Sequence, residues 1–337
     1  MRGIQVSKYL EKAEHVDHLA PISLPDPVPS HSQYLIAIRA AATNFFDILQ
    51  VQGKYQHQPP LPWISGMEFA GVVLKTPTSG SPRYKIGDRV FGASQGSYAT
   101  KICVSEDTLH PVPEGWSFED AAGLYVTVPT SYAALTVRAN VQPGEWVLVH
   151  AGAGGVGLAA IQVAKALGAK VIATAGTEDK LRVCKTFGAD HGVIYTNKTW
   201  TQEVLKLTGG RGVDVVYDPV GLVDLSMKCI NWNGRILVIG FAGGTIEKVA
   251  LNRVLLKNIS LVGIHWGAYQ KFEPEKIEGV WRDIFRLIEE GKFKPTVYNQ
   301  KFNGLANVGK ALKALGARET WGKVVVSIPE EEDRAKL

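Results

Sequence analysis

Seven residues near the middle of the chain, "AGAGGVG" at positions 151–157, carry glycines at the G-x-G-x-x-G spacing of dinucleotide-binding loops. The apolar run "WVLVH" precedes them and the helical pattern "LAAIQVAKALGA" follows, which is the strand, loop and helix context that this fingerprint requires. Without a Cβ the backbone can approach a pyrophosphate, and the helix N-terminus offers N–H groups and partial positive charge to it. The loop residues that we expect to bind the cofactor are Gly152, Ala153, Gly154, Gly155, Val156 and Gly157.

The second strand, "KVIATAGTEDK", indicates which dinucleotide is bound. A site for NAD has an Asp or Glu at the end of this strand, about 20 residues further on, to accept the ribose hydroxyls. Here the strand ends in Ala175, Gly176 and Thr177, and Glu178 and Asp179 come later, where we expect the first turn of the next helix with Thr177 as its N-cap. A missing carboxylate leaves room for a 2'-phosphate, so the sequence predicts NADPH.

Two side chains near that strand could reach the 2'-phosphate. Lys180 follows within one helical turn, and Tyr195 ends the third strand. The alternative for Lys180 is an ordinary solvent-exposed helix lysine.

The composition is that of an ordinary globular protein with more than one core. The chain has 337 residues, 45% of them hydrophobic and 20% charged, so we expect two domains. Its 37 basic and 32 acidic residues leave a net charge of +5 with no dense basic run, so nucleic acid is not an expected partner. Cys103, Cys184 and Cys229 are far apart and predict neither disulfides nor a cysteine zinc site.

The signals for location favour a soluble intracellular protein. The N-terminal stretch has no apolar segment typical of a signal peptide, and no apolar run is long enough for a membrane span. Ala335-Lys336-Leu337 is similar to the S-K-L peroxisomal signal. The peroxisomal matrix and the cytosol are therefore both open.

The distribution of apolar runs, Pro and Gly along the chain predicts an α/β protein of two domains. Residues 1–125 hold short β-type runs, such as the strand expected from "YLIAIRAAA", with many Pro and Gly residues. The chain after 268 begins with a helix whose apolar residues recur at spacings of 3 and 4, which predicts one buried face, and this part of the chain is expected to pack back onto residues 1–125. The apolar positions of that helix are Ile277, Val280, Trp281, Ile284, Phe285 and Ile288. Residues 126–267 alternate apolar strands with helical segments, which predicts a doubly wound parallel sheet. The division predicted is thus 1–125 with 268–337, and 126–267. The six expected strands of the sheet are 146–150, 170–175, 192–195, 213–218, 235–240 and 259–265.

Over essentially its whole length the chain resembles the zinc-free quinone oxidoreductase branch of the medium-chain dehydrogenase/reductase superfamily, the ζ-crystallin-like proteins. The resemblance implies a GroES-like catalytic domain, a Rossmann domain that binds NADPH, and a homodimer paired through the edge at 259–265. The stretches that carry it are 44–55, 62–73, 84–92, 151–169, 187–195, 213–221, 234–244 and 322–326.

The zinc site of related alcohol dehydrogenases is not reproduced. Their zinc-binding His is replaced by Met67, between Gly66 and Glu68, and their clustered cysteines are absent. A thioether is a poor Zn²⁺ ligand, so we expect no metal. Glu68 is interpreted as a structural residue.

The same resemblance implies roles for individual residues. It places Asn44, Asp47 and Tyr55 near the nicotinamide and the acceptor. Tyr55 or Asn44 could donate a hydrogen bond to the acceptor oxygen; the alternatives are a packed tyrosine and a turn-stabilising asparagine. Besides the glycine loop, the cofactor residues that it implies are Thr130, Gly176, Lys180, Tyr195, Phe241, Gly263, His265 and Trp266.

These expectations combine into a zinc-independent, NADPH-dependent reductase of quinones. An electron-poor acceptor tolerates negative charge on oxygen, so hydride transfer to it needs no metal. One alternative is an alkenal, enone or enoyl-thioester reductase of the same fold, and another is a non-catalytic NADPH-binding or structural protein of the crystallin kind. The acceptor is a small quinone or conjugated carbonyl compound in the first two readings.

Overall fold

The computed structural model describes residues 1–330, which form two compact units. The first unit comprises residues 1–126 and the chain from Pro295 onward, and the second comprises residues 127–294. The tripeptide 335–337 lies outside the described residues. Within residues 1–330 no helix is both long enough and apolar enough to cross a bilayer.

The predicted placement of residues 268–294 in the first unit is wrong. This segment contains α10 (Glu275–Glu289), which packs on α3 (Thr127–Ala133) of the second unit. The apolar face of α10 is buried, with Val280, Trp281 and Ile284 at its centre, and Tyr132 of α3 donates a hydrogen bond to Asp283 at 3.0 Å. The apolar spacing correctly indicated a buried helix face but could not identify the surface that covers it.

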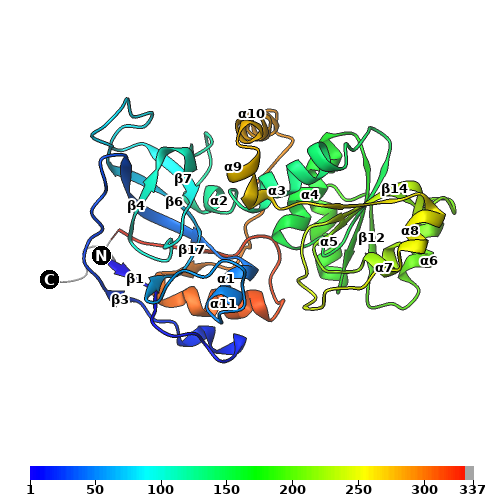
Figure 1. Ribbon diagram of the computed structural model, residues 1–337, viewed down its shortest axis with the longest axis horizontal. Helices are drawn as coiled ribbons and strands as arrows, with labels where there is room; N and C mark the ends of the chain where they lie inside the picture. The colour runs from blue at the N-terminus through cyan, green and yellow to red at the C-terminus, as the bar shows by residue number, and fades with distance from the viewer. Residues whose placement is uncertain (331–337) are drawn as a thin grey trace. The chain divides into compact units, whose positions relative to one another are not determined.

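The first unit is organised around β4 (Gln33–Ala42), the strand expected from "YLIAIRAAA". Its run of apolar residues is buried almost throughout, and its backbone pairs with neighbouring strands on both sides. The sheet has seven strands in the order β16-β17-β4-β6-β7-β9, with β8 also paired to β4. Strands β4, β6, β7 and β17 are labelled in Figure 1. The partner strands are β6 (Glu68–Lys75), β7 (Arg89–Ala93), β8 (Lys101–Ser105), β9 (Leu109–Pro111), β16 (Phe302–Asn303) and β17 (Val325–Ser327).

Short helices and turns pack against this sheet and against one another. Helix α11 (Val308–Gly316) packs against the 3-10 turn Ala13–His18 and against α1 (Phe45–Gln50), which is separated from the end of β4 by two residues. Helix α2 (Phe118–Ala122) packs on β4 and β6. The remaining strands and 3-10 turns are β1 (Arg2–Gly3), β2 (Gln5–Val6), β3 (Ile22–Ser23), β5 (Trp63–Ile64), Glu106–Thr108 and Leu305–Asn307.

The second unit is built on a six-stranded parallel sheet in the order β12-β11-β10-β13-β14-β15. In chain order this is 3-2-1-4-5-6, the arrangement of dinucleotide-binding sheets. Consecutive residues of the central strands are buried because helices cover both faces of the sheet. The strands are β10 (Trp146–Val149), β11 (Lys170–Ala175), β12 (His191–Ile194), β13 (Val213–Asp218), β14 (Ile230–Val238) and β15 (Ser260–Gly263).

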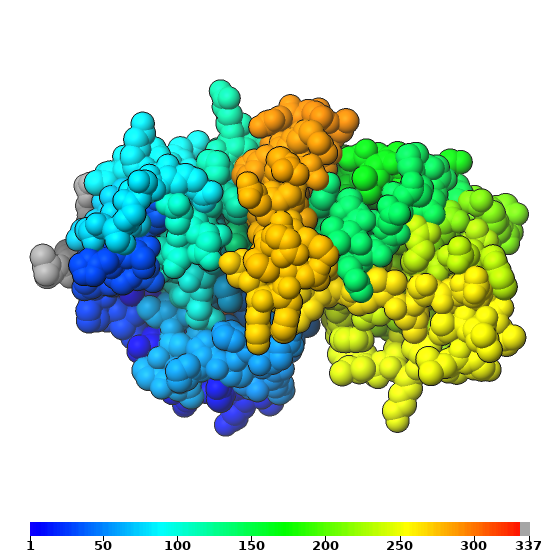
Figure 2. Space-filling view, turned by 45° about the horizontal axis from the view of Figure 1, so that its top comes forward, coloured from blue at the N-terminus to red at the C-terminus, as the bar shows by residue number. Residues whose placement is uncertain are grey.

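Helices connect these strands, as the alternating pattern predicted. Helix α8 differs from the others because it buries none of its residues, and the yellow segment that contains it lies at the surface in Figure 2. The connecting elements are α4 (Gly155–Ala166), α5 (Glu178–Thr186), α6 (Trp200–Leu207), α7 (Val223–Ser226) and α8 (Leu251–Lys257). The flanking elements are the π-helical turn Ala134–Arg138, the 3-10 turn Trp266–Ala268 and α9 (Tyr269–Phe272).

Candidate cofactor and acceptor sites

The glycine loop joins β10 to α4 at the carboxyl edge of the parallel sheet, as predicted. Its glycines permit a close approach of strand and helix. A Cβ on Gly157 would lie 2.4 Å from the carbonyl oxygen of Ala151, and a Cβ on Gly152 would lie 2.8 Å from the Cβ of Ala173. Both separations are shorter than real Cβ contacts. The sequence Gly-x-x-x-x-Gly therefore serves packing of the loop itself.

The N-terminus of α4 is suited to an anion. Its N-cap residue is Gly154, so no side chain covers the N–H groups of the first turn. A Cβ on Gly154 would have only the Ala151 carbonyl oxygen near it, at 3.3 Å. Ser131 Oγ donates to the carbonyl of Val156 at 3.0 Å and lies 2.9 Å from the Tyr217 hydroxyl, which anchors this turn to α3 and β13. The loop thus presents backbone donors and a helix dipole to a phosphate group.

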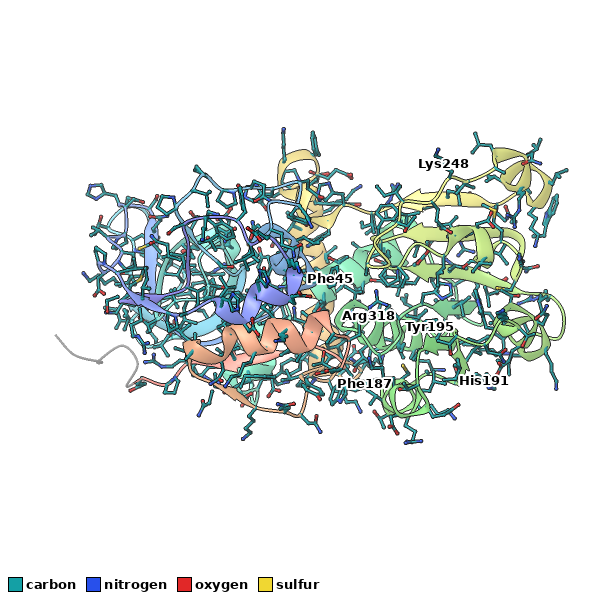
Figure 3. The ribbon with its side chains drawn as sticks, turned by 90° about the horizontal axis from the view of Figure 1, so that it is seen from below. Phe45, Phe187, His191, Tyr195, Lys248 and Arg318 are labelled. Atoms are coloured by element: carbon teal, nitrogen blue, oxygen red, sulfur yellow. The ribbon has the colours of Figure 1, made fainter. Side chains whose placement is uncertain are left out.

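The end of β11 has the features predicted for a 2'-phosphate site. Thr177 is the N-cap of α5, and its side chain accepts a hydrogen bond from Lys180 N at 3.3 Å, which confirms the predicted cap. A Cβ on Gly176 would lie 3.2 Å from the Tyr195 hydroxyl, so these two residues adjoin each other. Tyr195 directly follows β12, whose first residue is His191 (both labelled in Figure 3). Gly176, Lys180 and Tyr195 are therefore gathered at neighbouring strand ends.

The other cofactor residues predicted in the second unit also follow strands of the sheet. Phe241 lies in the loop after β14, and its side chain is 43% exposed. Gly263 ends β15, and His265 and Trp266 come directly after it. Since parallel strands have their carboxyl ends at one edge, the structure brings these residues to the same edge as the glycine loop. Thr130 lies on α3, the helix that packs on α4.

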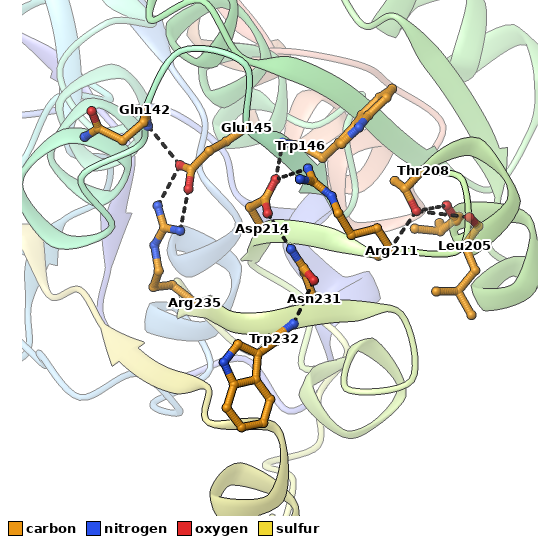
Figure 4. Close-up of polar contacts among 12 residues, drawn as sticks. Gln142, Glu145, Trp146, Leu205, Thr208, Arg211, Asp214, Asn231, Trp232 and Arg235 are labelled. Atoms are coloured by element: carbon orange, nitrogen blue, oxygen red, sulfur yellow. Dashed lines mark hydrogen bonds and ion pairs between the residues drawn. The ribbon is translucent and has the colours of Figure 1, made fainter.

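The opposite edge of the sheet has a different character (Figure 4). Glu145, which precedes β10, forms a two-pronged ion pair with Arg235 of β14 at 2.8 and 2.7 Å. Asp214 of β13 accepts from Trp146 N at 2.8 Å and from Asn231 Nδ2 at 2.9 Å. These side chains satisfy one another and tie the strands together, so this edge stabilises the sheet.

In the first unit, α1 positions two of the predicted residues in a buried polar cluster. Asp47 Oδ2 accepts from Asn44 N at 2.8 Å and from the Tyr98 hydroxyl at 2.6 Å. Burial raises the pKa of the Asp47 carboxyl to about 7, although the hydrogen bonds from Tyr98 and Asn44 oppose this rise. Asp47 Oδ1 is buried and has no partner among the described residues.

Asn44 also belongs to a charged group beneath α1. Its Nδ2 donates to Glu68 Oε2 at 2.8 Å, and its Oδ1 accepts from Lys323 Nζ at 2.7 Å. Lys323 Nζ lies 2.6 Å from Glu68 Oε2 as well, and both side chains are almost fully buried. Glu68 Oε1 accepts from Val126 N at 2.7 Å. We call Asn44, Glu68 and Lys323 the amide cluster.

Tyr55 adjoins the same helix. Its ring stacks on Phe46 with centroids 5.2 Å apart. Burial, and secondarily the charge of Asp47, raises the pKa of the Tyr55 hydroxyl, so the phenol stays protonated at neutral pH. Its hydroxyl makes no hydrogen bond to another residue of the chain between positions 1 and 330. The three residues predicted around the acceptor therefore lie together, with a phenol and an amide as donors.

Comparisons with known proteins agree with this arrangement. The alcohol dehydrogenase GroES-like domain matches residues 30–114, and the zinc-binding dehydrogenase family matches residues 155–284. Mouse quinone oxidoreductase-like protein 2 is 38% identical over 308 residues, covering 90% of this chain and 87% of its own. The chain belongs to the quinone oxidoreductase family of medium-chain dehydrogenases/reductases.

Solved structures extend this family assignment. The structure of Escherichia coli quinone oxidoreductase complexed with NADPH superposes with a TM-score of 0.87 at 31% identity, covering 98% of this chain and 100% of that one. The CurK enoyl reductase superposes with a TM-score of 0.86 at 26% identity, covering 97% of this chain and 99% of that one. The predicted fold, a GroES-like domain with a Rossmann-type sheet, is confirmed.

Sequence reasoning missed two members of the polar cluster in this quinone oxidoreductase-like chain. Lys323 lies in the stretch 322–326 that carries the resemblance, but the sequence predicts no role for it or for Tyr98. A lysine that is 3% exposed runs against the general tendency of charged residues, and its three acceptors, Glu68 among them, explain its burial. The signal available beforehand was a lysine directly before three valines of a predicted strand.

Met67 lies beside Glu68 with its side chain half-buried. Over residues 1–330 there is no group of three or more His, Cys, Asp or Glu side chains that could hold a metal ion.

Proposed function

We propose that the protein is an NADPH-dependent, zinc-independent reductase of quinones. Two features of the second unit together carry the proposal. The N-terminus of α4, after β10, is lined by glycines and has no side-chain cap. The end of β11 has Gly176 beside Tyr195 and no carboxylate. Membership of the quinone oxidoreductase family and the NADPH complex of the E. coli structure support it.

NADPH, when bound, supplies the hydride, and the residues of the chain bind and orient the reactants. The N–H groups at the start of α4 receive the pyrophosphate, and Lys180 and Tyr195 receive the 2'-phosphate. Asn44 and Tyr55 donate hydrogen bonds to the acceptor carbonyl, which holds the ring and stabilises charge on its oxygen as hydride arrives. Quinone, hydride and one proton from solvent give the hydroquinone.

Zinc independence rests on the state of Glu68. Its carboxylate already accepts from Asn44, Lys323 and Val126, so both of its oxygens are engaged by donors of the protein. Met67 places a thioether next to it, which is a poor ligand for Zn²⁺. Metal content measured on the purified active protein tests this point, and stoichiometric zinc in it would overturn the mechanism.

A second candidate function is reduction of the double bond of an enone, alkenal or enoyl thioester. The likeness to the CurK enoyl reductase favours including it. In that reaction the hydride goes to the β-carbon, while the same two donors, Asn44 and Tyr55, bind the carbonyl oxygen. The two reactions use the same cofactor site, so the acceptor decides between them.

The test is a panel of acceptors with NADPH oxidation as the readout. We expect ortho- and para-quinones to be reduced faster than enals, enones and enoyl-CoA thioesters. A preference for the conjugated carbonyl compounds replaces the first function by the second. Tight NADPH binding with no oxidation by any acceptor identifies a non-catalytic protein, and a preference for NADH overturns the cofactor assignment.

We also propose a homodimer paired through β15. This strand is at the edge of the six-stranded sheet, where its backbone groups can pair with another chain. Helix α8, which precedes it, exposes Leu251, Leu255 and Leu256, each more than 70% exposed. Leu255→Glu is expected to shift the mass measured by light scattering from dimer to monomer, whereas Asn252→Glu on the same helix leaves it unchanged. A monomeric wild-type protein contradicts this proposal.

A further inference from the structure

The amide cluster contains an ion pair whose location needs a reason beyond stability. Lys323 and Glu68 are 3% and 0% exposed, respectively. Removing two charges from water costs several kcal/mol per ion, and apolar replacements of such pairs are often neutral or stabilising. The pair also lies under α1, in direct contact with a residue assigned to the acceptor site.

Its contacts fix the orientation of the Asn44 amide. An ammonium group can only donate, so Lys323 Nζ selects the oxygen Oδ1, at 2.7 Å. A carboxylate can only accept, so Glu68 Oε2 selects the nitrogen Nδ2, at 2.8 Å. A flipped amide would place its NH₂ group against the ammonium and its oxygen against the carboxylate. Asn44 therefore has one favourable orientation.

One hydrogen-bond donor of the amide cluster has no acceptor within residues 1–330. Lys323 Nζ has three hydrogens and three acceptors, namely Thr43 O at 3.0 Å, Asn44 Oδ1 and Glu68 Oε2. Glu68 is satisfied at both oxygens. Asn44 Nδ2 has two hydrogens and uses one for Glu68; the second has no acceptor within residues 1–330. The side chain with the spare donor is the one that is 7% exposed, rather than either buried charge.

We propose that Lys323 and Glu68 are positioning residues, which hold the amide of Asn44 so that its second N–H is the fixed donor for the acceptor carbonyl. The proposal rests on the proposed function and adds to it the means by which the donor is oriented. The backbone also fixes the lysine, because Lys323 N donates to Thr296 O at 2.8 Å. A donor that needs no reorientation during the reaction stabilises developing charge more effectively than a mobile one.

The first test removes the lysine donor while keeping its volume. Lys323→Met is expected to lower kcat for quinone reduction about 10- to 100-fold, as expected for loss of an oriented charge-stabilising donor. The Kd of NADPH and the KM of the quinone should stay within about threefold, because the amide acts mainly as charge develops. Lys323→Arg, which restores a donor, is expected to recover part of kcat. A change in KM alone would contradict the proposal.

Lys323→Met leaves Glu68 buried and unpaired, so stability needs its own control. The double variant Lys323→Met/Glu68→Gln removes both charges and is expected to regain stability while kcat stays low. Recovery of both stability and kcat in the double variant would show that the pair is only structural. The matched control is Arg235→Met/Glu145→Gln, which removes the partly buried ion pair of the second unit, at the edge of the parallel sheet opposite the glycine loop. This double variant is expected to leave kcat unchanged.

A double-mutant cycle places the effect on Asn44. Asn44→Ala removes the amide itself, so adding Lys323→Met to it is expected to lower kcat no further. Additive losses from the two substitutions would mean that Lys323 acts independently of Asn44, which overturns the proposal.

The orientation can also be measured without turnover. In protein labelled with ¹⁵N-asparagine, the two Nδ2 hydrogens of Asn44 are expected to have chemical shifts far from those of exposed asparagines and to exchange slowly with water. In Lys323→Met both features are expected to move toward those of an exposed asparagine. A wild-type protein that reduces no quinone but shows this change would refute the proposed function while keeping the locked amide. Unchanged signals in Lys323→Met would refute the positioning role, whatever the activity.

Discussion

The candidate site of the second unit is formed mainly by backbone groups, whereas that of the first unit is formed by side chains. In the second unit the glycine loop offers backbone N–H groups at an uncapped helix end, and its side chains are mostly absent. In the first unit Asn44 and Asp47, two of the three predicted acceptor residues, belong to a buried network of charged and polar side chains around α1. A site made of backbone depends on shape, since a Cβ added at Gly152 or Gly157 collides with it. A site made of side chains depends on charge and hydrogen-bond direction, so substitutions that preserve shape can still disable it.

The largest expected effect breaks the backbone site by adding one carbon. Gly157→Ala places its Cβ 2.4 Å from the carbonyl oxygen of Ala151, and backbone on both sides cannot move freely. We expect a loss of about 3 kcal/mol in the free energy of unfolding, the upper part of the usual overpacking range, together with about 100-fold weaker NADPH binding. Chemical denaturation and fluorescence titration with NADPH measure the two quantities.

Gly154→Ala is the matched control for this collision. Its Cβ has one neighbour, at 3.3 Å, so the fold should retain almost its full stability while the methyl group obstructs the phosphate. Binding should therefore weaken without unfolding. Equal stability losses in the two variants would show that the glycines act only in folding and not in forming a cradle.

The second effect tests the side-chain site through pH. The pKa of Asp47 is about 7 in the folded protein against an ordinary value of 3.8, because the carboxyl is buried. Between these values the folded protein keeps a proton that the unfolded chain has lost, so this residue lowers the free energy of unfolding as pH rises from about 4 to about 7. Asp47→Asn cannot titrate and lacks this dependence.

The measurement is the difference in unfolding free energy between wild type and Asp47→Asn. We expect it to shift in favour of the variant by on the order of 3 kcal/mol between about pH 4.5 and about pH 8. Any constant cost of the new amide cancels in this comparison. A difference that is independent of pH would mean that Asp47 is charged throughout and that its burial is offset by its partners.

The same contrast explains what the sequence could predict. Backbone sites leave a spacing pattern, because glycine is required wherever a Cβ would collide, as at Gly152 and Gly157. Continuous apolar runs likewise predicted the six parallel strands, and apolar residues at spacings of 3 and 4 predicted the helix at α10. The predicted residues after β10, β11, β12, β14 and β15 then shared an edge because parallel strands must end together.

The side-chain site was predicted only in part, for a physical reason. Asn44 and Asp47 are three residues apart on one helix, so their proximity could be foreseen, but Lys323 is 279 residues away from Asn44 along the chain. No local pattern records which strand places a lysine under which helix. The same limit explains the misplaced segment 268–294, whose apolar face was evident while its partner α3 was not.

A smaller effect on NADPH affinity is expected at Lys180, whose charge adds to the backbone groups of the cofactor site. Lys180→Ala should weaken NADPH about 10- to 100-fold through loss of a charge-assisted contact with the 2'-phosphate, and leave NADH binding unchanged. Lys185→Ala, in the last turn of the same helix, is the control for a general loss of positive charge. Isothermal titration with both cofactors decides the matter, and equal weakening of NADPH and NADH would remove Lys180 from the phosphate site.

The smallest effect separates shape from hydrogen bonding at a single point, where Tyr195 meets Gly176. Tyr195→Phe keeps the ring and removes only the hydroxyl, so NADPH should bind about 2- to 10-fold more weakly if the hydroxyl donates to the phosphate. Gly176→Ala instead adds a methyl group 3.2 Å from that hydroxyl and displaces the ring. If Tyr195 acts as a donor, the phenylalanine variant should lose NADPH affinity and retain NADH affinity. If Tyr195 contributes only its shape, Tyr195→Phe should bind both cofactors normally, whereas Gly176→Ala should bind both more weakly. The end of β11 would then depend on shape, like the glycine loop.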